Sequence, residues 1–420
     1  MKYDVLFLHP PAAYDFRKRV IFPGPIAETV RESSSQFIIF PVGLLSMAEY
    51  LERNGSNVEI FNLGEQMTSN PNFDAQRFIE KTESDIYAID LHWCTHAHGS
   101  IEIARLCKKL HPSSLVVLGG LTATCFHTEI IRFPFVDVVL RGESEKAILQ
   151  LVDNLADSRK IRKVGNATYR GKDGKIYVNS LMEPCKDLDE FEFTRFDLVT
   201  PKDLSTTARV PEKMTSWNIP LCRGCTQNCI TCGGSAHSYL TLCGREKPAF
   251  RSPTKIVEDL QKLKEQKFEH VFLFQDPRIG GKSYQSELFE SLAKEKIDIS
   301  LTMELFNPAS EGFLNELKKT KMNVALTFSP ESGVERVRRF HGRDYTSDEI
   351  FRTIELCRKF NVRLSLFFMI GLSKETWETL NETWKFIEII AKIDREIRLG
   401  EKEQLYSYPF LFNFAFGPMI

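Results

Sequence analysis

Cysteines are the residues whose type and spacing point most directly to chemistry. The chain has 10 cysteines in 420 residues, and Cys222, Cys225, Cys229 and Cys232 fall close together. The spacing C-x₃-C-x₂-C from Cys225 to Cys232 places three thiolates on one loop, which can wrap three corners of a cubane iron–sulfur cluster and leave the fourth iron open. With Cys222 the set could instead supply four zinc ligands, although three residues between the two pairs are too few for separate zinc knuckles.

Composition and charge exclude several other classes of protein. The chain has 55 Lys+Arg, 56 Asp+Glu and a formal net charge of −1, which gives no electrostatic signal for a nucleic-acid partner. We predict no membrane span, because no uncharged apolar stretch reaches about 18–20 residues. The N-terminus carries Asp4 before a short apolar run, unlike a signal peptide. We therefore expect a cytoplasmic protein with reduced thiols, in which clustered cysteines bind a metal or do redox chemistry.

The first half of the chain shows an alternation of predicted strands and helices. In residues 1–157, short apolar runs alternate with amphipathic helices, as in a parallel sheet that is covered on both faces. This pattern predicts an α/β, flavodoxin-like (Rossmann-like) domain whose ligand lies over the carboxyl ends of the strands. The predicted strands are residues 5–8, 58–61, 86–89, 115–118 and 136–140, and the predicted helices are residues 43–54, 101–110 and 145–156.

Residues 158–215 are predicted to form a connector, with a hairpin at 166–179 that turns at Lys172-Asp173-Gly174. Residues 216–420 show six further strand–helix units, which predict a partial (βα)₆ barrel of the TIM type with its active site at the carboxyl ends of the strands. The predicted strands are residues 217–221, 270–274, 299–304, 323–328, 363–370 and 411–416, and the predicted helices are residues 253–266, 283–294, 311–319, 347–360 and 374–391. The cysteine loop follows the first of these strands, at residues 217–221. The apolar C-terminal run 414–420 either closes the barrel or marks a chain that is part of a longer protein.

The loop Arg223-Gly-Cys225-Thr-Gln-Asn-Cys229-Ile-Thr-Cys232-Gly-Gly234 resembles the cluster loop of the radical S-adenosylmethionine (SAM) superfamily. Segments 272–276, 327–333 and 368–376 resemble, in the expected order, the later strand ends that contact SAM in that superfamily. The residue before the last cluster cysteine is commonly aromatic there but is Thr231 here, so adenine contact is expected from Ile370 or Phe272 instead. The resemblance implies a [4Fe–4S] cluster on Cys225, Cys229 and Cys232, and SAM contacts from Gly233, Gly234, Asp276, Glu331, Ser332, Ile370 and Gly371.

The first half resembles the cobalamin-binding domain that precedes the radical SAM domain in one large subgroup, so that the resemblance covers nearly the whole chain. No Asp-x-His-x-x-Gly loop follows the first strand, which implies base-off cobalamin without an axial histidine from that loop. The histidines of segment 92–98 could touch the corrin edge, or could belong to a polar loop around a buried Trp93. The resemblance implies cobalamin contacts from Pro10, Pro41, Gly43, Trp93, Gly119, Gly120, Thr122, Gly142 and Glu143.

Together these resemblances imply a cobalamin-dependent radical SAM enzyme, and methyl transfer from methylcobalamin to an unactivated substrate carbon is the expected reaction. Three alternatives stay open: a radical cyclase or ring-rearranging enzyme, a methylthiotransferase-like enzyme, and a non-catalytic cobalamin-binding sensor or carrier. A small-molecule or peptide substrate and a low-potential electron donor of the flavodoxin or ferredoxin type are expected as partners. No catalytic side chain is assigned.

Overall fold

The computed structural model describes residues 2–18, 40–155, 158–200, 216–400 and 409–413. The chain divides into two compact units, each of which is described by itself. The first unit comprises Met1–Lys186, Glu190–Lys213 and Leu240–Arg245, and the second comprises Asp187–Asp189, Met214–Tyr239 and Glu246–Ile420. The domain boundaries predicted at residues 157 and 215 lie outside the described residues and stay predictions.

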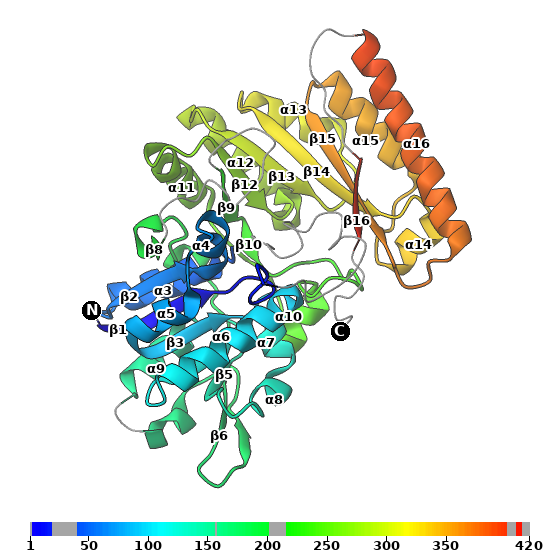
Figure 1. The fold of residues 1–420 in the computed structure, drawn as a ribbon. Coiled ribbons are helices and arrows are strands. Elements are labelled where there is room, and N and C mark those ends of the chain that lie inside the picture. Colours follow the sequence, from blue (N-terminus) through cyan, green and yellow to red (C-terminus); the bar gives the residue numbers. More distant parts are fainter. Residues whose placement is uncertain (1, 19–39, 156–157, 201–215, 401–408, 414–420) are drawn as a thin grey trace. The chain divides into compact units, whose positions relative to one another are not determined.

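The first unit is built on an eight-stranded sheet with the strand order β7-β6-β5-β4-β3-β1-β2-β8 (Figure 1). The order β2-β1-β3-β4-β5 is parallel and confirms the flavodoxin-like prediction. β8 extends the parallel sheet beside β2, whereas β6 and β7 form an antiparallel hairpin on the β5 edge. The strands are β1 (Lys2–His9), β2 (Val58–Asn62), β3 (Glu83–Asp90), β4 (Leu115–Gly119), β5 (Val138–Leu140), β6 (Ala167–Arg170), β7 (Ile176–Val178) and β8 (Val199–Thr200).

Helices cover both faces of this sheet, with α3 packed on α9 and α5 packed on α6 (Figure 1). The helices are α3 (Gly43–Arg53), α4 (Leu63–Ser69), α5 (Ala75–Lys81), α6 (Ala97–Leu110), α7 (Leu121–Cys125), α8 (His127–Ile130) and α9 (Glu145–Asp153). Short 3₁₀ helices lie at η1 (Cys94–His96), η2 (Ser158–Lys163), η3 (Leu188–Glu190) and η4 (Phe196–Leu198). The sequence did not predict α4 and α5, because each has about two turns and depends on side-chain caps from Asn62 and Asp74.

The second unit is built on a parallel sheet with the strand order β16-β15-β14-β13-β12-β9, which confirms the six predicted strand–helix units. The strands are β9 (Ser216–Pro220), β12 (His270–Phe274), β13 (Ser300–Leu305), β14 (Val324–Glu331), β15 (Arg363–Ile370) and β16 (Pro409–Asn413). The last strand was predicted at residues 411–416, of which 414–416 lie outside the described residues. A short antiparallel pair joins β10 (Cys222–Arg223) to β11 (Ala249–Phe250).

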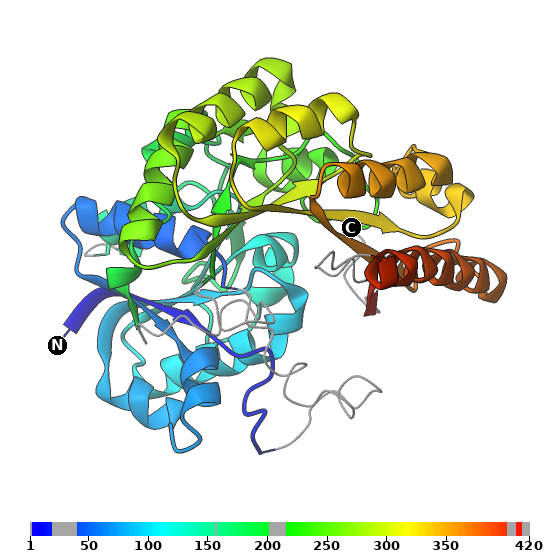
Figure 2. The same cartoon turned by 90° about the horizontal axis from the view of Figure 1, so that it is seen from above.

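The helices that link these strands lie along the outer side of the curved sheet (Figure 2). They are α11 (Pro253–Glu265), α12 (Gly281–Glu295), α13 (Glu311–Lys319), α14 (Glu335–Phe340), α15 (Ser347–Lys359) and α16 (Trp377–Gly400), with α10 (Ala236–Cys243) after the cysteine loop and η5 (Pro277–Gly280) after β12. Along β13 the burial alternates, with Leu301, Met303 and Leu305 buried and the residues between them half-buried. Such alternation gives the sheet a dry face and a partly open inner face.

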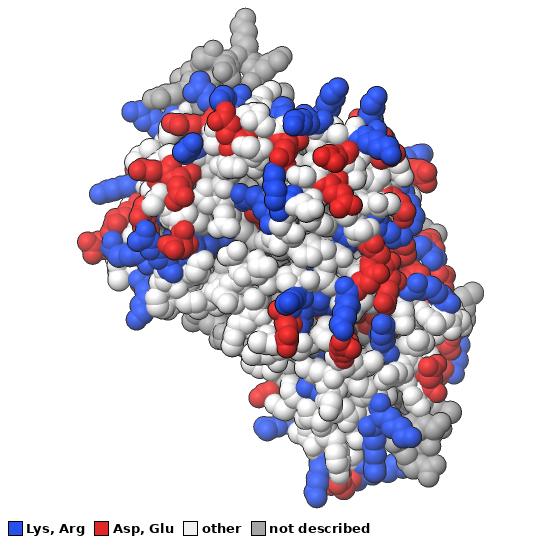
Figure 3. Space-filling view, turned by 180° about the vertical axis from the view of Figure 1, so that it is seen from behind, with Lys and Arg blue, Asp and Glu red and all other residues white. Residues whose placement is uncertain are grey.

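Charge is mixed over the surface. On the face that Figure 3 shows, lysines and arginines are interspersed with aspartates and glutamates, as a net charge of −1 leads one to expect. Among the described residues, no helix is both long and apolar enough to cross a membrane.

A buried histidine makes the second sheet sensitive to acid. His270 is buried, and its ring nitrogens lie 2.7 Å from Ser216 Oγ and 2.8 Å from Thr302 Oγ1. Burial lowers the pKa of His270 from 6.5 to about 4. Between these values the unfolded chain binds a proton that the folded chain does not, so the free energy of unfolding falls as the pH drops.

We predict that this histidine costs about 3 kcal/mol of stability between pH 6.5 and pH 4, since each pKa unit is worth about 1.4 kcal/mol. Urea unfolding followed by the fluorescence of Trp217, which is buried in the neighbouring strand β9, measures the effect. His270→Gln should flatten the pH dependence in this window, whereas His237→Gln, at an exposed position, should not. Equal slopes in His270→Gln and the wild type would contradict the prediction.

Candidate functional site

The cysteine loop is anchored at both of its ends by backbone contacts. Before it, β10 pairs with β11, and Gly224 has φ +106°, which is a conformation that favours glycine. Within it, the Cys232 N–H donates to the Cys229 carbonyl at 3.2 Å, and the Ala236 N–H donates to the Gln227 carbonyl at 2.8 Å. These backbone hydrogen bonds fold the loop back on itself, so that its three cysteines are held in one short segment.

The three predicted cluster cysteines differ in exposure, because Cys225 is half-buried, Cys229 is buried and Cys232 is exposed. The Gln227 N–H lies 3.3 Å from Cys225 Sγ, and the Gly234 N–H lies 3.4 Å from Cys232 Sγ. Backbone donors of this kind favour thiolates, and hydrogen bonds to sulfur also tune the potential of a cluster. Cys222 is buried in β10 instead, with its Sγ 3.4 Å from the Gly224 carbonyl oxygen.

Three thiols on one short loop suit a cubane cluster, because each thiolate can bind a different iron while the fourth iron stays open. Cys222, which a zinc site with four thiolates would need, is buried in β10 with its Sγ near the Gly224 carbonyl oxygen. Cys225, Cys229 and Cys232 therefore fit a [4Fe–4S] cluster.

An ion pair at the end of β14 faces the cysteine loop. Glu331 is buried in a left-handed conformation with φ +68°, and Arg343 Nη2 donates to its Oε1 at 2.6 Å. Thr231 Oγ1 lies 3.4 Å from Glu331 Oε2, so that the carboxylate joins the cysteine loop to Arg343. A Cβ on Gly342 would lie 3.4 Å from the Cys229 Cα, which shows how closely the chain before Arg343 packs on the loop.

Arg343 supplies positive charge to this region. Burial raises the pKa of the Cys229 thiol, whereas the Arg343 charge lowers it. Arg343 also lowers the pKa of Cys225 and of Glu304, both of which burial raises. The sequence analysis did not single out Arg343. Its position after Gly342, in the loop that follows Glu331-Ser332-Gly333, is the signal that could have found it.

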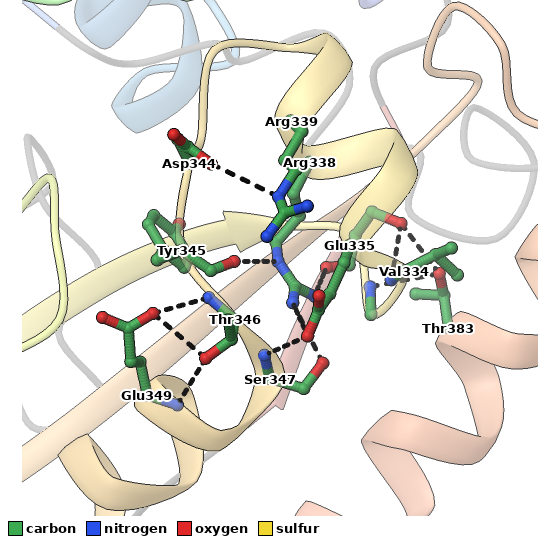
Figure 4. A network of polar contacts seen from close by, with 12 residues as sticks. Val334, Glu335, Arg338, Arg339, Asp344, Tyr345, Thr346, Ser347, Glu349 and Thr383 are labelled. Carbon is green, nitrogen blue, oxygen red and sulfur yellow. Dashed lines mark hydrogen bonds and ion pairs between the residues drawn. The ribbon is translucent and has the colours of Figure 1, made fainter.

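Ser332 and Gly333, which follow Glu331 in the chain, pack against α16. Ser332 Oγ lies 3.1 Å from Thr383 Oγ1 in α16, and a Cβ on Gly333 would lie 2.7 Å from the Phe386 Cβ. The Ser332 carbonyl accepts from Arg338, which is a fully buried cation. Arg338 also donates to Ser347 Oγ (Figure 4). The hydroxyl of Ser332, which was predicted to contact SAM, is thus engaged within the protein.

Asp276 likewise has its carboxylate engaged. Arg278 Nη2 donates to Asp276 Oδ2 at 2.6 Å, and the Phe306 N–H donates to the same oxygen at 2.8 Å. Asp276 therefore ties the end of β12 to the segment after β13. Glu304, which the sequence analysis did not single out, lies at the end of β13 and accepts from the Gln275 N–H at 2.7 Å.

The other predicted SAM residues lie at strand ends or on the cysteine loop. Ile370 ends β15, and Gly371 follows with φ +88° while its N–H donates to Glu375 Oε2 at 2.7 Å. Gly233 is exposed, and a Cβ there would meet nothing within 4 Å. A Cβ on Gly234 would lie 3.7 Å from Cys232 Sγ, in ordinary contact with the sulfur.

The predicted cobalamin residues gather along one edge of the first sheet, and all lie within a few residues of a strand's carboxyl end or at the start of α3. Pro10 follows β1, Trp93 follows β3 and is half-buried, and Thr122 Oγ1 donates to the His92 carbonyl at 2.9 Å. The remainder are Pro41 and Gly43 around the start of α3, Gly119 and Gly120 at the end of β4, and Gly142 and Glu143 after β5.

The two glycines after β4 are not equivalent. Gly120 has φ +112°, and a Cβ there would lie 2.6 Å from the His92 Cα, so the fold itself requires a glycine. A Cβ on Gly119 would have its nearest contact at 3.7 Å, so Gly119 leaves space at the sheet edge. Glu143 accepts from Arg245 Nε at 2.6 Å and from the Cys185 N–H at 3.2 Å, which engages its carboxylate within this unit. The open edge at Gly119 fits a flat cofactor, in agreement with cobalamin.

Comparison with known proteins finds one matching family for each half of the chain. The family model described as the Radical SAM superfamily matches residues 219–387, and the one described as the B12 binding domain matches residues 29–152. An uncharacterised methyltransferase of Pyrococcus horikoshii is 26% identical over 352 residues, which cover 82% of this chain and 72% of the relative. An anaerobic magnesium-protoporphyrin IX monomethyl ester cyclase of Rubrivivax gelatinosus is 23% identical over 361 residues, which cover 82% of this chain and 61% of the cyclase.

Two solved structures share the fold along most of the chain. The radical SAM methyltransferase TsrM from Kitasatospora setae matches with a TM-score of 0.66 and 14% identity, over 93% of this chain and 71% of TsrM. The cobalamin-dependent SAM radical enzyme OxsB matches with a TM-score of 0.62 and 15% identity, over 92% of this chain and 52% of OxsB.

The fold and the two family matches define a protein with a B12-binding domain followed by a radical SAM domain. The chain therefore belongs to the radical SAM proteins that carry a B12 binding domain, and these two domains imply a [4Fe–4S] cluster, SAM and cobalamin as cofactors.

We predict that Cys225, Cys229 and Cys232 are each required for a SAM-binding cluster, since loss of one thiolate exposes a second iron. Single Cys→Ala variants, reconstituted without oxygen, should lose most of their iron and their SAM-dependent paramagnetic signal. Cys222→Ala is the matched control and should keep both, because its sulfur is buried in β10. Full cluster occupancy and SAM cleavage in Cys229→Ala would contradict the assignment.

Arg343→Gln should lower the reduction potential of the cluster by on the order of tens of millivolts, because a nearby cation stabilises the added electron. A redox titration followed by paramagnetic resonance measures this potential. Arg339→Gln removes an exposed arginine that pairs with Asp344 from the same segment, so it should leave the potential unchanged. Equal potentials in the two variants would show that Arg343 does not act on the cluster.

Proposed function

We propose that the enzyme methylates an unactivated carbon of its substrate. SAM would be cleaved reductively to methionine and a 5′-deoxyadenosyl radical, the radical would remove a substrate hydrogen, and a methyl group would reach that carbon by way of cobalamin. The observation that carries the proposal is the presence of both cofactor domains in one chain. A radical generator needs no cobalamin and polar methyl transfer needs no cluster, whereas an unactivated carbon requires both kinds of chemistry.

Two comparisons favour methylation over other outcomes. The relative from Pyrococcus horikoshii is named a methyltransferase, and its alignment covers 82% of this chain at 26% identity. TsrM, with the same fold, is also a methyltransferase by name. Neither fixes the atom that receives the methyl group here, so C-methylation is the part of the proposal that experiment must test.

The residues of the second unit have distinct roles in this proposal. The three cysteines hold the cluster, while the backbone at Gly233 leaves room for SAM, because a Cβ there would meet nothing within 4 Å. The Glu331–Arg343 pair fixes the charge beside Cys229 and joins the end of β14 to the cysteine loop. Such preorganised charge costs no rearrangement when the reaction occurs.

The inner face of the second sheet is the proposed substrate surface. Glu304, Thr327 and Ser365 are half-buried and lie side by side across β13, β14 and β15. Phe272 and Thr302, which pair in register on β12 and β13, add an aromatic ring and a hydroxyl on the same side. Hydroxyls beside a carboxyl group suit a small molecule or peptide with hydrogen-bonding groups. We also propose a flavodoxin- or ferredoxin-type electron donor, because the cleavage of SAM consumes an electron.

Cyclisation is the second candidate, since the alignment with the cyclase of Rubrivivax gelatinosus also covers 82% of this chain, at 23% identity. A methylthiotransferase would need a second cluster, yet outside the cysteine loop the sequence has no further cysteine triad. A sensor or carrier would have no use for a radical generator, whereas the three-thiol loop is intact in this chain. Formation of 5′-deoxyadenosine by the reconstituted protein separates an enzyme from a binder.

If the enzyme is a methylase, each methylated product should consume two SAM molecules. One should become S-adenosylhomocysteine by giving up its methyl group, and the other should become 5′-deoxyadenosine and methionine. Incubation with methyl-labelled SAM, a low-potential reductant and cobalamin should give both co-products in slow abortive turnover, even without the true substrate. 5′-Deoxyadenosine without S-adenosylhomocysteine, at saturating cobalamin, would overturn methylation and favour cyclisation.

A further inference from the structure

Three buried metal-ligating side chains meet at the carboxyl edge of the first sheet. β1 and β3 are neighbouring parallel strands, so His9 and Asp90, their last residues, lie side by side. His96, at the end of η1, brings a second imidazole to the same place. The side chains of His9 and Asp90 are 2% and 4% exposed, and that of His96 is 0% exposed.

The donor atoms have nearly the spacing of one coordination sphere. His9 Nδ1 lies 3.0 Å from Asp90 Oδ2, and His96 Nδ1 lies 3.9 Å from the same oxygen. One donor atom from each residue lies within 4.8 Å of the others, and this is the one such group of His, Cys, Asp and Glu among the described residues. Ligands about 2.0–2.2 Å from a common ion are separated by about 3.0–3.5 Å, so small side-chain shifts would complete the geometry.

A simple ion pair explains only part of this arrangement. One protonated imidazole would balance the buried Asp90 carboxylate, and His9 is in hydrogen-bond range to do so. The imidazole of His96 lies perpendicular to the His9 ring, with the ring centroids 5.0 Å apart, and adds a further nitrogen beside the same oxygen. Two imidazoles and one carboxylate on one side of an ion form the donor set that proteins use for divalent first-row transition metals.

Further contacts hold the donors in position, as is usual around metal ligands. Ser100 Oγ donates to the Asp90 carbonyl at 2.6 Å. The His9 ring packs edge-on against Phe40 at 5.4 Å, and the His96 ring packs against Trp93 at 5.9 Å. These rings surround the three donors with apolar groups.

We propose that His9, Asp90 and His96 form a structural site for a divalent first-row transition metal ion such as Zn²⁺ or Fe²⁺. The ion would join the segment after β1 to the segment after β3, and so fix Pro10 and Trp93, which flank the site on these two segments. The site is independent of the cysteine loop and does not depend on the proposed methylation.

Cobalt(II) chloride is the probe, because its absorption separates nitrogen and oxygen ligands from thiolates. The full chain carries Cys225→Ala, Cys229→Ala and Cys232→Ala, which remove the iron–sulfur cluster, and is prepared without cobalamin. We expect one cobalt ion per chain, ligand-field bands without a thiolate charge-transfer band, and displacement by Zn²⁺. His96→Gln and Asp90→Asn should weaken binding at least about tenfold. His98→Gln, which removes a half-buried histidine of the same segment, should bind as the parent does.

A second measurement keeps all three donors intact. Cobalt(II) should quench the fluorescence of Trp93, whose ring lies 5.9 Å from that of His96, and Trp93→Phe should abolish this quenching without changing the stoichiometry. Absence of both the bands and the quenching would mean that His9 and Asp90 form an ion pair only, which overturns the proposal. A thiolate charge-transfer band, or equal affinity in His96→Gln and the parent, would overturn it as well.

Discussion

Parallel strand pairing is the constraint from which both candidate sites follow. In a parallel sheet every strand ends at the same edge, so residues that are far apart in the sequence meet there. Cys225, Glu304 and Glu331 are separated by many residues, yet all lie at or just beyond the carboxyl ends of β9, β13 and β14. The first unit gathers Pro10, Trp93 and Gly119 by the same rule.

Burial of charge is the second organising feature of the radical SAM domain. Glu331 is buried in a left-handed conformation, which is uncommon for a residue with a side chain. This geometry persists because Arg343 neutralises the carboxylate and because Ser332 and Gly333 are packed against α16. The ion pair with Arg343 and the packing against α16 thus stabilise the strained backbone of Glu331. The cysteine loop thereby lies beside charges that are held in place.

Much of the architecture was predictable because strand and helix periodicities are strong in both sheets. β12, α13 and β15 match their predicted bounds, since β12 and β15 are rich in Leu and Phe and α13 has a Ser310 cap. α4 and α5 were missed, because about two turns give too little periodicity to recognise. The cluster cysteines were predicted from their spacing together with the resemblance of their loop to the radical SAM cluster loop, and this assignment stays a prediction. The sequence motifs could not predict Arg343, because its importance comes from a fold that packs Gly342 against Cys229.

The sequence also could not show which polar side chains have hydrogen-bond partners within the protein. Ser332 and Asp276 lie in SAM-like motifs, yet their polar atoms are engaged by Thr383 and by Arg278. Conversely, Glu304 lies in a stretch with no motif, and only the alternating burial of β13 places it on the inner face. Hydrogen-bond partners distant in sequence decide such cases, and periodicity carries no information about them.

The contrast between Gly119 and Gly120 has a consequence for reading related sequences. Since a side chain at position 120 would collide with the backbone of His92, glycine would persist there in a descendant that had lost cobalamin altogether. Position 119 has no such steric barrier, and selection for the cofactor would be the main force that keeps it small. In a genome survey, the first glycine of the pair would therefore be the better marker of a retained cofactor, and a lineage with a bulky residue there would have its cobalamin dependence in question.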